Sequence, residues 1–468
     1  MIHEGFDPDF SDAVRQQVAS LEQQPPATGE GLEDLRDLVW SSIDNDTSRD
    51  LDQIEYAERV AEGIRVLIGI ADVTAEVALG SPIDEHARSQ TTTVYTTPRV
   101  FPMLPEELST DLTSLEEAQD RAAIVIEMVV APDGSIVSSG VRQALVRNKA
   151  QLAYGDVGSW LEGQAGPPAK VAASADLQSQ LQLQNEAARA MRQRRVSLGA
   201  LRFDRIEPQA VITNGHVTDI AASPKNKAND LIEDFMVGAN EVMARLLKDS
   251  GVSSIRRVVR SPERWARIVE LAARYGTHLP EQPDSGALNA FLMERRNADR
   301  LHYPDLSLAV LKLMGPGEYV MAKPGDAAEG HFGLAANDYT HSTAPNRRFA
   351  DMVVQRMVKS VIDKAPPPYA DDELADIARN CTLKEDAARK VERTMNKRVA
   401  AVALQNRIGQ QFDGVITGVT PKGVFVRILR PPVEGRIMHG EQGVDVGDRV
   451  HVKLIGADPQ RGFIDFAR

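Results

Sequence analysis

The sequence has a single cysteine, Cys381, among 468 residues. One cysteine cannot form an intramolecular disulfide, which fits a reducing compartment and favours a small core residue over a reactive thiol. The chain also has no run of about 18 apolar residues, the length that a membrane-spanning helix requires. Its start, MIHEGFDPDF, has neither the basic nor the apolar region of a secretion signal. These absences predict a cytoplasmic protein with no membrane association.

Basic residues are not in excess, because the formal net charge is −13. Residues 1–60 hold 15 acidic and 4 basic side chains, a balance of −11, which leaves −2 for the other 408 residues. A nearly neutral body can still form a basic channel, so the net charge does not exclude a nucleic acid as partner. The length allows two to four domains with proper cores.

Clusters of cysteine and histidine that would bind zinc are absent, but residues 40–55, WSSIDNDTSRDLDQIE, concentrate carboxylates. The aspartates of this acidic stretch are Asp44, Asp46, Asp50 and Asp52. Carboxylates so close together repel one another unless a cation lies among them. Because carboxylate oxygen is a hard ligand, the ions to expect are Mg²⁺, Mn²⁺ or Ca²⁺.

Three kinds of site compete for the acidic stretch. An EF-hand loop is matched at its ligand positions from Asp44 to Glu55, but Arg49 stands where the sharp turn calls for glycine. A catalytic carboxylate cluster would bind one or two Mg²⁺ ions for phosphodiester hydrolysis. A solvated acidic turn is the third alternative.

The pattern of apolar residues predicts an α+β fold. Strands are expected at 64–73, 122–130 and 136–145, and the last two are joined by Ala-Pro-Asp-Gly, which is typical of a hairpin turn. A short polar helix is expected at 9–24, and apolar residues recur at near-helical spacing over 32–39. Longer helices are expected at 177–195, 227–247, 262–275, 351–362 and 371–405.

From residue 407 onward the sequence changes to short alternating strands separated by glycine and proline. This pattern predicts a small five-stranded β-barrel. Phe412 and Phe425, with basic residues Lys422, Arg427 and Arg436, favour single-stranded nucleic acid stacked on aromatic rings. An accessory barrel without a ligand is the alternative.

Residues 330–351, GHFGLAANDYTHSTAPNRRFAD, combine histidines, hydroxyl groups and an arginine pair. Arg347 and Arg348 stand where a helix is predicted to begin, so guanidinium and backbone N–H groups can both meet a phosphate. A metal and an arginine on opposite sides of a phosphorus stabilise the charge that develops in phosphoryl transfer. An arginine pair that caps surface carboxylates is the alternative.

Five ordered blocks of the chain resemble the catalytic domain (RNB) of the ribonuclease II family. They are Ile43-Asp44 with Asp50-Leu51-Asp52, IADV at 70–73, VYTTPRVFPMLPEELSTDLTSL at 94–115, AQLAYGDVGSWLE at 150–162, and HFGLAANDYTHSTAPNRRFADMVVQR at 331–356. The barrel resembles the OB-fold RNA-binding module of a ribosomal protein, the usual C-terminal partner in this family. The resemblance implies a short helical segment at 1–30, a mixed α/β RNB domain at 31–365, a helical connector at 366–406 and an OB-fold domain at 407–468.

The resemblance also implies an activity, a processive Mg²⁺-dependent 3′-to-5′ exoribonuclease that works as a monomer, with Mn²⁺ as a substitute ion. Single-stranded RNA would enter a buried channel and leave as nucleoside 5′-monophosphates. By position, Asp44, Asp50 and Asp52 match metal ligands, Asp52 is also catalytic, and Arg347 matches the arginine at the scissile phosphate. Residues implied or predicted to contact RNA are Tyr95 on the 3′-terminal base, Glu392 at the terminal nucleotide, Tyr154 beside the RNA path, His341, Arg348, Phe412 and Phe425.

The chain departs from the family pattern in two places. Gln53 stands where the family has its fourth aspartate, and Asp46 is a candidate to supply that carboxylate, directly or through water. Residues 1–30 are too few for the cold-shock-type domains that commonly precede the catalytic body. Two other functions therefore stay open, a catalytically silent RNA-binding protein and a Ca²⁺-binding protein built on the EF-like loop.

Overall fold

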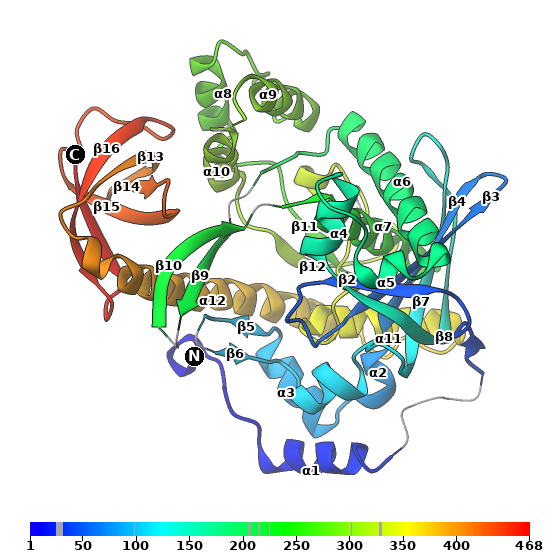
Figure 1. The fold of residues 1–468 in the computed structure, drawn as a ribbon. Helices are drawn as coiled ribbons and strands as arrows, with labels where there is room; N and C mark the ends of the chain where they lie inside the picture. The colour runs from blue at the N-terminus through cyan, green and yellow to red at the C-terminus, as the bar shows by residue number, and fades with distance from the viewer. Residues whose placement is uncertain are drawn as a thin grey trace.

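A computed structural model describes residues 1–24, 31–97, 99–204, 207–213, 216–223, 225–300, 302–326 and 330–468. Helices and sheets are mixed through most of the chain, and a closed five-stranded barrel forms the C-terminal part. The predicted α+β class with a C-terminal barrel is therefore confirmed. Figure 1 shows a large body around a curled sheet and the barrel at the opposite end of the molecule, connected by one long helix.

The larger body is organised around a six-stranded sheet with the order β1-β8-β2-β3-β4-β7. Its strands are β1 (Glu33–Asp34), β2 (Trp40–Asp44), β3 (Gln53–Val60), β4 (Gly63–Ala71), β7 (Asp120–Val130) and β8 (Ile136–Ala153). The long strand β8 pairs with β7 through its first part and with β2 through its last residues, so the sheet curls back on itself. Both faces of β4 are buried because Val66, Leu67 and Ile68 are all inaccessible to solvent.

Helices surround this sheet. The two longest in the body are α6 (Ala175–Ser197) and α7 (Lys227–Asp249), which pack on each other, and α6 also contacts β3. Helix α11 (Phe349–Ile362) is buried over nearly its whole length. Shorter helices are α1 (Asp12–Leu21), α2 (Val73–Glu76), α3 (Pro82–Gln90), α4 (Tyr154–Leu161) and α5 (Ala169–Ala172). Separate strand pairs are β5 (Val94–Tyr95) with β6 (Val100–Phe101), β9 (Glu207–Thr213) with β10 (His216–Ser223), and β11 (Ser254–Val258) with β12 (Glu318–Ala322).

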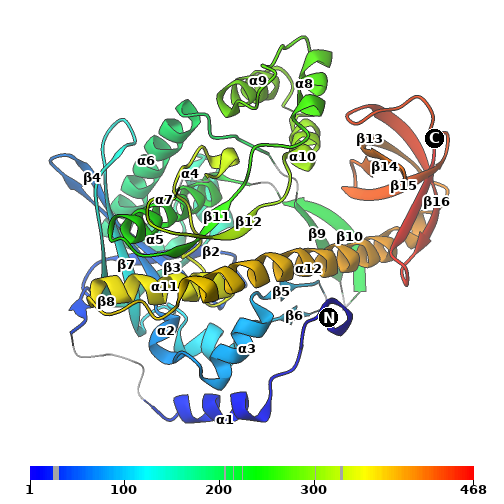
Figure 2. The ribbon, with the colours of Figure 1, turned by 180° about the vertical axis from the view of Figure 1, so that it is seen from behind.

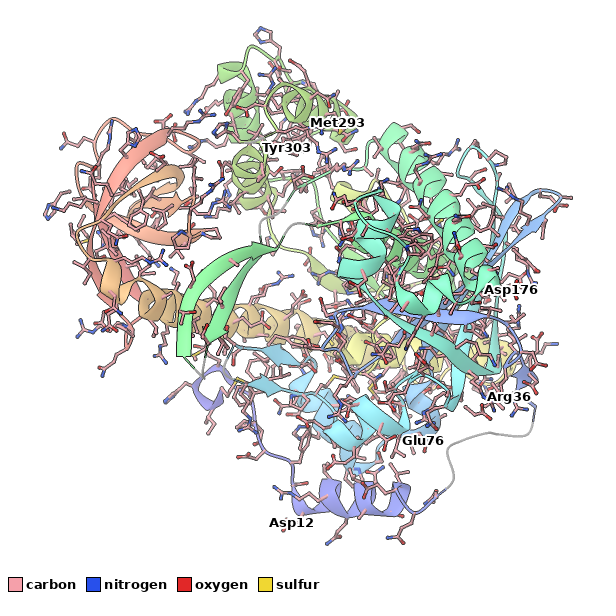
Figure 3. All side chains as sticks on the ribbon, viewed as in Figure 1. Asp12, Arg36, Glu76, Asp176, Met293 and Tyr303 are labelled. Carbon is pink, nitrogen blue, oxygen red and sulfur yellow. The ribbon has the colours of Figure 1, made fainter. Side chains whose placement is uncertain are left out.

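Three helices form a small module with a hydrophobic core of its own. They are α8 (Trp265–Arg274), α9 (Ser285–Ala298) and α10 (Tyr303–Met314). Figure 3 labels Met293 and Tyr303 in this module, at the top of the molecule and away from the curled sheet. Ion pairs join the module to the barrel, among them Lys312 with Glu434 at 2.7 Å and Arg449 with Asp299 at 3.2 Å.

The barrel is attached through α12 (Asp371–Leu404), which Figure 2 shows running from the body to the barrel. The barrel strands are β13 (Gln411–Thr420), β14 (Gly423–Ile428), β15 (Val433–His439), β16 (Arg449–Asp458) and β17 (Phe463–Ala467). They close in the order β13-β14-β15-β17-β16. The end of α12 contributes Ala401 and Leu404 to the barrel core, which fixes the helix to the barrel. The domain limits 1–30, 31–365, 366–406 and 407–468 stay a prediction.

The structure corrects the predicted secondary structure in one region and refines it in another. Residues 32–39 are not helical, because they form the short strand β1 and a turn that leads into β2. The acidic stretch is a loop only from 45 to 52, since its two ends belong to β2 and β3. All five longer helices that the sequence predicts are present, with ends shifted by a few residues.

The single cysteine and the absence of long apolar runs can be compared with the structure. Cys381 is buried in the core, and burial raises the pKa of its thiol to about 12, so it is the inert core residue that the sequence favours. Among the described residues, no helix has the length and apolar character needed to cross a membrane.

Arg356 in α11 supports the body through a buried ion pair. Its guanidinium lies 2.8 Å from Asp84, donates to the hydroxyl of Tyr369 at 2.6 Å and donates to the Val77 carbonyl at 2.9 Å. Arg356→Ala would leave the Asp84 carboxylate buried without its cation, so we expect a loss of about 3–5 kcal/mol in the free energy of unfolding. Chemical denaturation followed by circular dichroism measures this loss.

The matched control is Arg379→Ala in α12. Arg379 forms an ion pair with Asp376, but both side chains are about two-thirds exposed, so the expected change is below about 1 kcal/mol. Equal losses in the two variants would contradict the stabilising role of the buried pair.

Candidate active site

The acidic loop is held between two adjacent strands. Asp44 ends β2, and β3 begins at Gln53, with Ser41 paired to Glu55 in antiparallel register. This register brings Asp44 and Asp52 opposite each other at the open end of the strand pair. The EF-hand alternative is therefore wrong, because an EF-hand loop lies between two helices, whereas this loop lies between two strands.

Asp52 is the most deeply buried carboxylate of the loop, with 4% of its surface exposed. One of its oxygens accepts a hydrogen bond from the Asn346 backbone N–H at 3.2 Å, and the other lies 3.6 Å from Arg347 Nε. Burial raises the pKa of Asp52 to about 7, although Arg347 opposes the shift, and the charge of Asp50 adds to it. Arg347 therefore does not fully compensate the negative charge of the buried Asp52 carboxylate.

The other aspartates of the loop differ in their surroundings. Asp44 Oδ1 accepts hydrogen bonds from the Asn45 backbone N–H at 2.7 Å and from Ser48 Oγ at 3.0 Å. Burial raises the pKa of Asp50, and the charge of Asp44 raises it further. Asp46 lies exposed on the turn.

Gln53, at the position of the missing carboxylate, points its amide back into the protein. Its side chain is 7% exposed and Nε2 donates to the Ile43 carbonyl at 3.4 Å. The amide therefore makes a structural contact across the β2–β3 pair and adds no charge to the site.

Arg347 and Arg348 are adjacent in sequence but have different roles in the structure. Arg347 lies in the turn before α11 and its side chain is 43% exposed, with Asp52 as its ion-pair partner. Arg348 makes two hydrogen bonds to Asp351, from Nε at 2.9 Å and from Nη2 at 2.7 Å. Arg347 can therefore approach a phosphate, whereas Arg348 binds a carboxylate of its own helix, and the RNA contact of Arg348 stays a prediction.

His341 is also engaged by the protein. Its Nδ1 lies 2.8 Å from the Tyr319 hydroxyl, and its ring packs edge-on against Tyr319 and Tyr339. Burial lowers the pKa of His341 well below its usual range, with nearby arginines acting in the same direction. A neutral, packed imidazole gives no electrostatic contact to a phosphate, so the structure offers no support for the predicted RNA contact of His341.

Tyr95 and Glu392 come together although 297 residues separate them in the sequence. The Tyr95 backbone N–H in β5 donates to Glu392 Oε1 of α12 at 2.9 Å, and the tyrosine is 42% exposed. Phe6 is buried against Val94 and Ala388, so the first residues of the chain pack beside this pair. The contact joins β5 to α12 and leaves the aromatic ring accessible.

Tyr154 lies at the start of α4, where β8 ends. With Asn45 of the acidic loop it lines a cavity of about 850 Å³, which also reaches Arg257, His331 and Arg389. The volume lies in the usual range for ligand-binding cavities, and the cavity extends from the acidic loop to α12.

A second cavity, of about 440 Å³, lies between α12 and the barrel. Its lining includes Glu392 and the basic residues Arg389, Arg393 and Lys397. The three basic residues recur every four positions along α12, so they share one helix face. The four-residue spacing of Arg389, Arg393 and Lys397 is visible in the sequence and indicates a basic helix face, which the predicted site residues do not include.

The barrel aromatics do not line these two cavities. The ring of Phe412 packs edge-on against Phe466 with 6.5 Å between centroids, and Lys397 Nζ lies 6.0 Å from the centre of the Phe425 ring. The cationic contact places Phe425 beside the basic face of α12.

The donor set fits a hard divalent cation. Asp44, Asp50 and Asp52 provide only carboxylate oxygen, and a cation would supply the positive charge that buried Asp52 lacks. Within the described residues, no three acidic, histidine or cysteine side chains already converge as a preformed ligand group.

Comparisons with known proteins agree with this arrangement. Residues 32–364 match the family model described as the RNB domain, and residues 410–468 match the RNase II-type exonuclease C-terminal S1 domain. The curated relative Ribonuclease R 1 of Lactococcus lactis is 28% identical over 98% of this chain, and the chain spans 59% of that relative's length.

Two solved structures show the same fold. Mycoplasma genitalium RNase R in complex with ribose methylated single-stranded RNA matches with a TM-score of 0.89 and 24% identity, over 100% of this chain and 76% of that chain. Yeast Ssd1, described as a pseudonuclease, matches with a TM-score of 0.68 and 19% identity, over 90% of this chain and 51% of that chain. The RNB-domain model covers well over half of the chain, and the protein therefore belongs to the RNB family.

Proposed function

We propose that this chain is a hydrolytic exoribonuclease that removes nucleotides from the 3′ end of single-stranded RNA as nucleoside 5′-monophosphates. The observation that carries the proposal is the position of Arg347, 3.6 Å from buried Asp52, with Asp50 on the same loop and Asp44 at the end of β2 just before it. A cation among the carboxylates and the exposed guanidinium beside them would contact a phosphate together, as phosphoryl transfer requires.

The residues of the loop and of the α11 turn have distinct tasks in this proposal. Asp44, Asp50 and Asp52 hold Mg²⁺, for which Mn²⁺ can substitute. When bound, the ion polarises the phosphate and lowers the pKa of a water molecule. Arg347 orients the scissile phosphate. Arg348 acts behind it, because Asp351 binds Arg348 and also accepts from the Ala344 backbone N–H at 2.8 Å, which stabilises the turn.

The 3′ end of the RNA is held by residues far apart in the chain. Glu392 fixes β5 through the Tyr95 backbone, and the exposed Tyr95 ring stacks on the terminal base. Tyr154 borders the RNA in the cavity of about 850 Å³. The basic face of α12 and the barrel residues Phe412 and Phe425 guide the strand towards this cavity, which suits a monomer acting on one RNA strand at a time.

A catalytically silent RNA-binding protein is the second candidate. The likeness to a protein described as a pseudonuclease means that the fold alone does not decide between the two. Gln53 favours the silent candidate, since it removes one carboxylate. Three aspartates on and beside the loop and an accessible Arg347 favour the enzyme, because a binding protein has no need of buried, uncompensated carboxylate charge.

A single assay separates these two candidates. We expect a 5′-labelled single-stranded oligoribonucleotide to be shortened stepwise from its 3′ end in Mg²⁺, and EDTA to slow shortening by about 10³-fold or more. Gel-shift measurement on the same samples reports RNA binding separately. Binding without shortening would establish the silent candidate, and shortening that persists in EDTA would contradict the metal-dependent mechanism.

A further inference from the structure

The backbone of residues 91–95 connects two parts of the candidate active site. Near the middle of this segment, the Thr93 backbone N–H donates a hydrogen bond to the Arg347 carbonyl at 3.0 Å. At its end, the Tyr95 backbone N–H donates to Glu392 Oε1 at 2.9 Å. A shift of the segment would therefore displace both the arginine and the tyrosine.

The first residues of the chain cover this segment. Phe6 is 2% exposed and packs against Val94 of β5 and Ala388 of α12. Val94 directly precedes Tyr95, and Ala388 lies about one helical turn before Glu392. Figure 1 and Figure 2 both show the N-terminus beside β5, β6 and α12. Phe6 therefore contacts both β5 and α12 close to the hydrogen bond that joins them.

Two lysines of α12 hold the residues next to Phe6. Glu4 Oε1 lies 2.7 Å from Lys390 Nζ. Lys384 donates to the Gly5 carbonyl, and its Nζ lies 4.9 Å from the centre of the Phe6 ring. These contacts keep Phe6 at one place along the helix.

A further contact fixes the start of the 91–95 segment. The Asp7 backbone N–H donates at 3.2 Å to Oε1 of Gln90, the last residue of α3. Gln90 is 4% exposed and directly precedes Thr91. Phe6 and its neighbour therefore contact the 91–95 segment near both of its ends.

We propose that Phe6 is a positioning residue for the candidate active site, because its contact with Val94 holds the 91–95 segment against α12. The inference rests on the proposed function, in which Tyr95 stacks on the terminal base and Arg347 orients the phosphate. Phe6 itself would touch neither the RNA nor the cation and would act through these two residues. Small displacements of such groups matter, since a misplacement of about 1 Å can reduce a rate by about 10²-fold.

The test compares RNA shortening by the full chain and by its Phe6→Ala variant, in single turnovers at saturating RNA and well below both melting temperatures. We expect the rate to fall by about 10-fold or more, because Tyr95 and Arg347 lose their common support. RNA affinity, measured by gel shift in EDTA, should change by less than about threefold, because the basic face of α12 is unaltered. Phe6→Leu keeps most of the buried side chain and should retain the rate within about threefold.

Fluorescence distinguishes a positioning role from a purely stabilising one. An oligoribonucleotide with 2-aminopurine at its 3′ end, measured in EDTA so that it stays intact, reports stacking of the terminal base on Tyr95. We expect Phe6→Ala to lose part of the quenching that the unmodified chain produces. Tyr95→Ala supplies the fluorescence without this stacking.

Phe10→Ala is the matched control in the same N-terminal segment. Phe10 packs against the main hydrophobic core and the ring of His86 in α3, with 4.6 Å between ring centroids. This variant should lower the melting temperature and leave the rate and the fluorescence unchanged. An unchanged rate or unchanged fluorescence in Phe6→Ala, or an equal rate loss in Phe10→Ala, would overturn the proposal. If Phe6→Ala does not fold, Phe6→Val decides, with an expected rate loss of about threefold or more, and an unchanged rate again overturns the proposal.

The failure of this inference can be told apart from the failure of the proposed function. If the unmodified chain shortens RNA and Asp52→Asn abolishes the shortening, the proposed function holds whatever Phe6→Ala does. If the unmodified chain binds RNA without shortening it, the proposed function fails and the positioning role of Phe6 fails with it.

Discussion

Asp52→Asn is expected to reduce RNA hydrolysis by about 10³-fold or more while RNA binding persists. Asp52 is proposed both as a metal ligand and as a neighbour of Arg347, so the amide removes a ligand and the negative charge that orients the guanidinium. Single-turnover shortening of a labelled oligoribonucleotide measures the first effect, and a gel shift measures the second. Residual hydrolysis above about a tenth of the original rate would contradict the role of Asp52.

The same substitution is expected to stabilise the metal-free protein. The pKa of Asp52 is raised to about 7 in the folded chain, above an unfolded value of about 3.9. Below about pH 4 the Asp52 carboxyl is largely protonated in both the folded and the unfolded chain, so it does not lower the free energy of unfolding. As the pH rises to about 7, the unfolded chain releases the proton more readily than the folded chain, so stability falls and then levels off.

Asp52→Asn removes this pH-dependent fall in the free energy of unfolding, because an amide does not titrate. In EDTA at pH 8 we expect the variant to gain on the order of 1–4 kcal/mol, whereas at pH 4 the two proteins should be nearly equal. Denaturation curves at the two pH values measure the difference. A variant less stable than the unmodified chain at pH 8 would show that Asp52 is compensated in the metal-free protein.

Arg347→Lys is expected to lower hydrolysis by about 10²- to 10³-fold with little change in folding stability. Lysine keeps the positive charge but not the planar fork with which a guanidinium binds two phosphate oxygens. The Arg347 side chain is 43% exposed, so its replacement leaves no buried cavity. The rate at saturating RNA and the melting temperature are the two quantities to compare.

Arg348→Lys is the matched control, one residue away. Its guanidinium is bonded twice to Asp351, which has none of its surface exposed, so the main expected loss is in stability, by about 1–3 kcal/mol. The proposed roles would be contradicted if Arg348→Lys lost activity without losing stability while Arg347→Lys remained fully active.

Much of the architecture could be predicted from local sequence because it depends on local periodicity. Helices such as α6, α7 and α12 are long and strongly patterned, and the barrel strands alternate over short runs between turn residues. Residues 32–39 do not form the predicted helix, because apolar spacing over eight residues is too short to distinguish a helix from a strand and a turn. Tertiary pairing of β1 with β8 decides the conformation there.

The site was predictable in part. The aspartates of the acidic stretch are close in sequence, so their spacing alone predicts a metal site. The flanking strands β2 and β3, which exclude an EF-hand, are seen only in the structure. The meeting of Tyr95 with Glu392 depends on the packing of α12 and could be expected only from the family resemblance.

The central claim is that the chain releases single nucleotides from the RNA 3′ end with the phosphate on the 5′ carbon. Chromatography of the first products from a 3′-end-labelled oligoribonucleotide in Mg²⁺ tests it most directly. The proposed function predicts nucleoside 5′-monophosphate from the first turnover, and none in Asp52→Asn. Labelled oligonucleotides, nucleoside 3′-phosphates, or bound but intact RNA would contradict it.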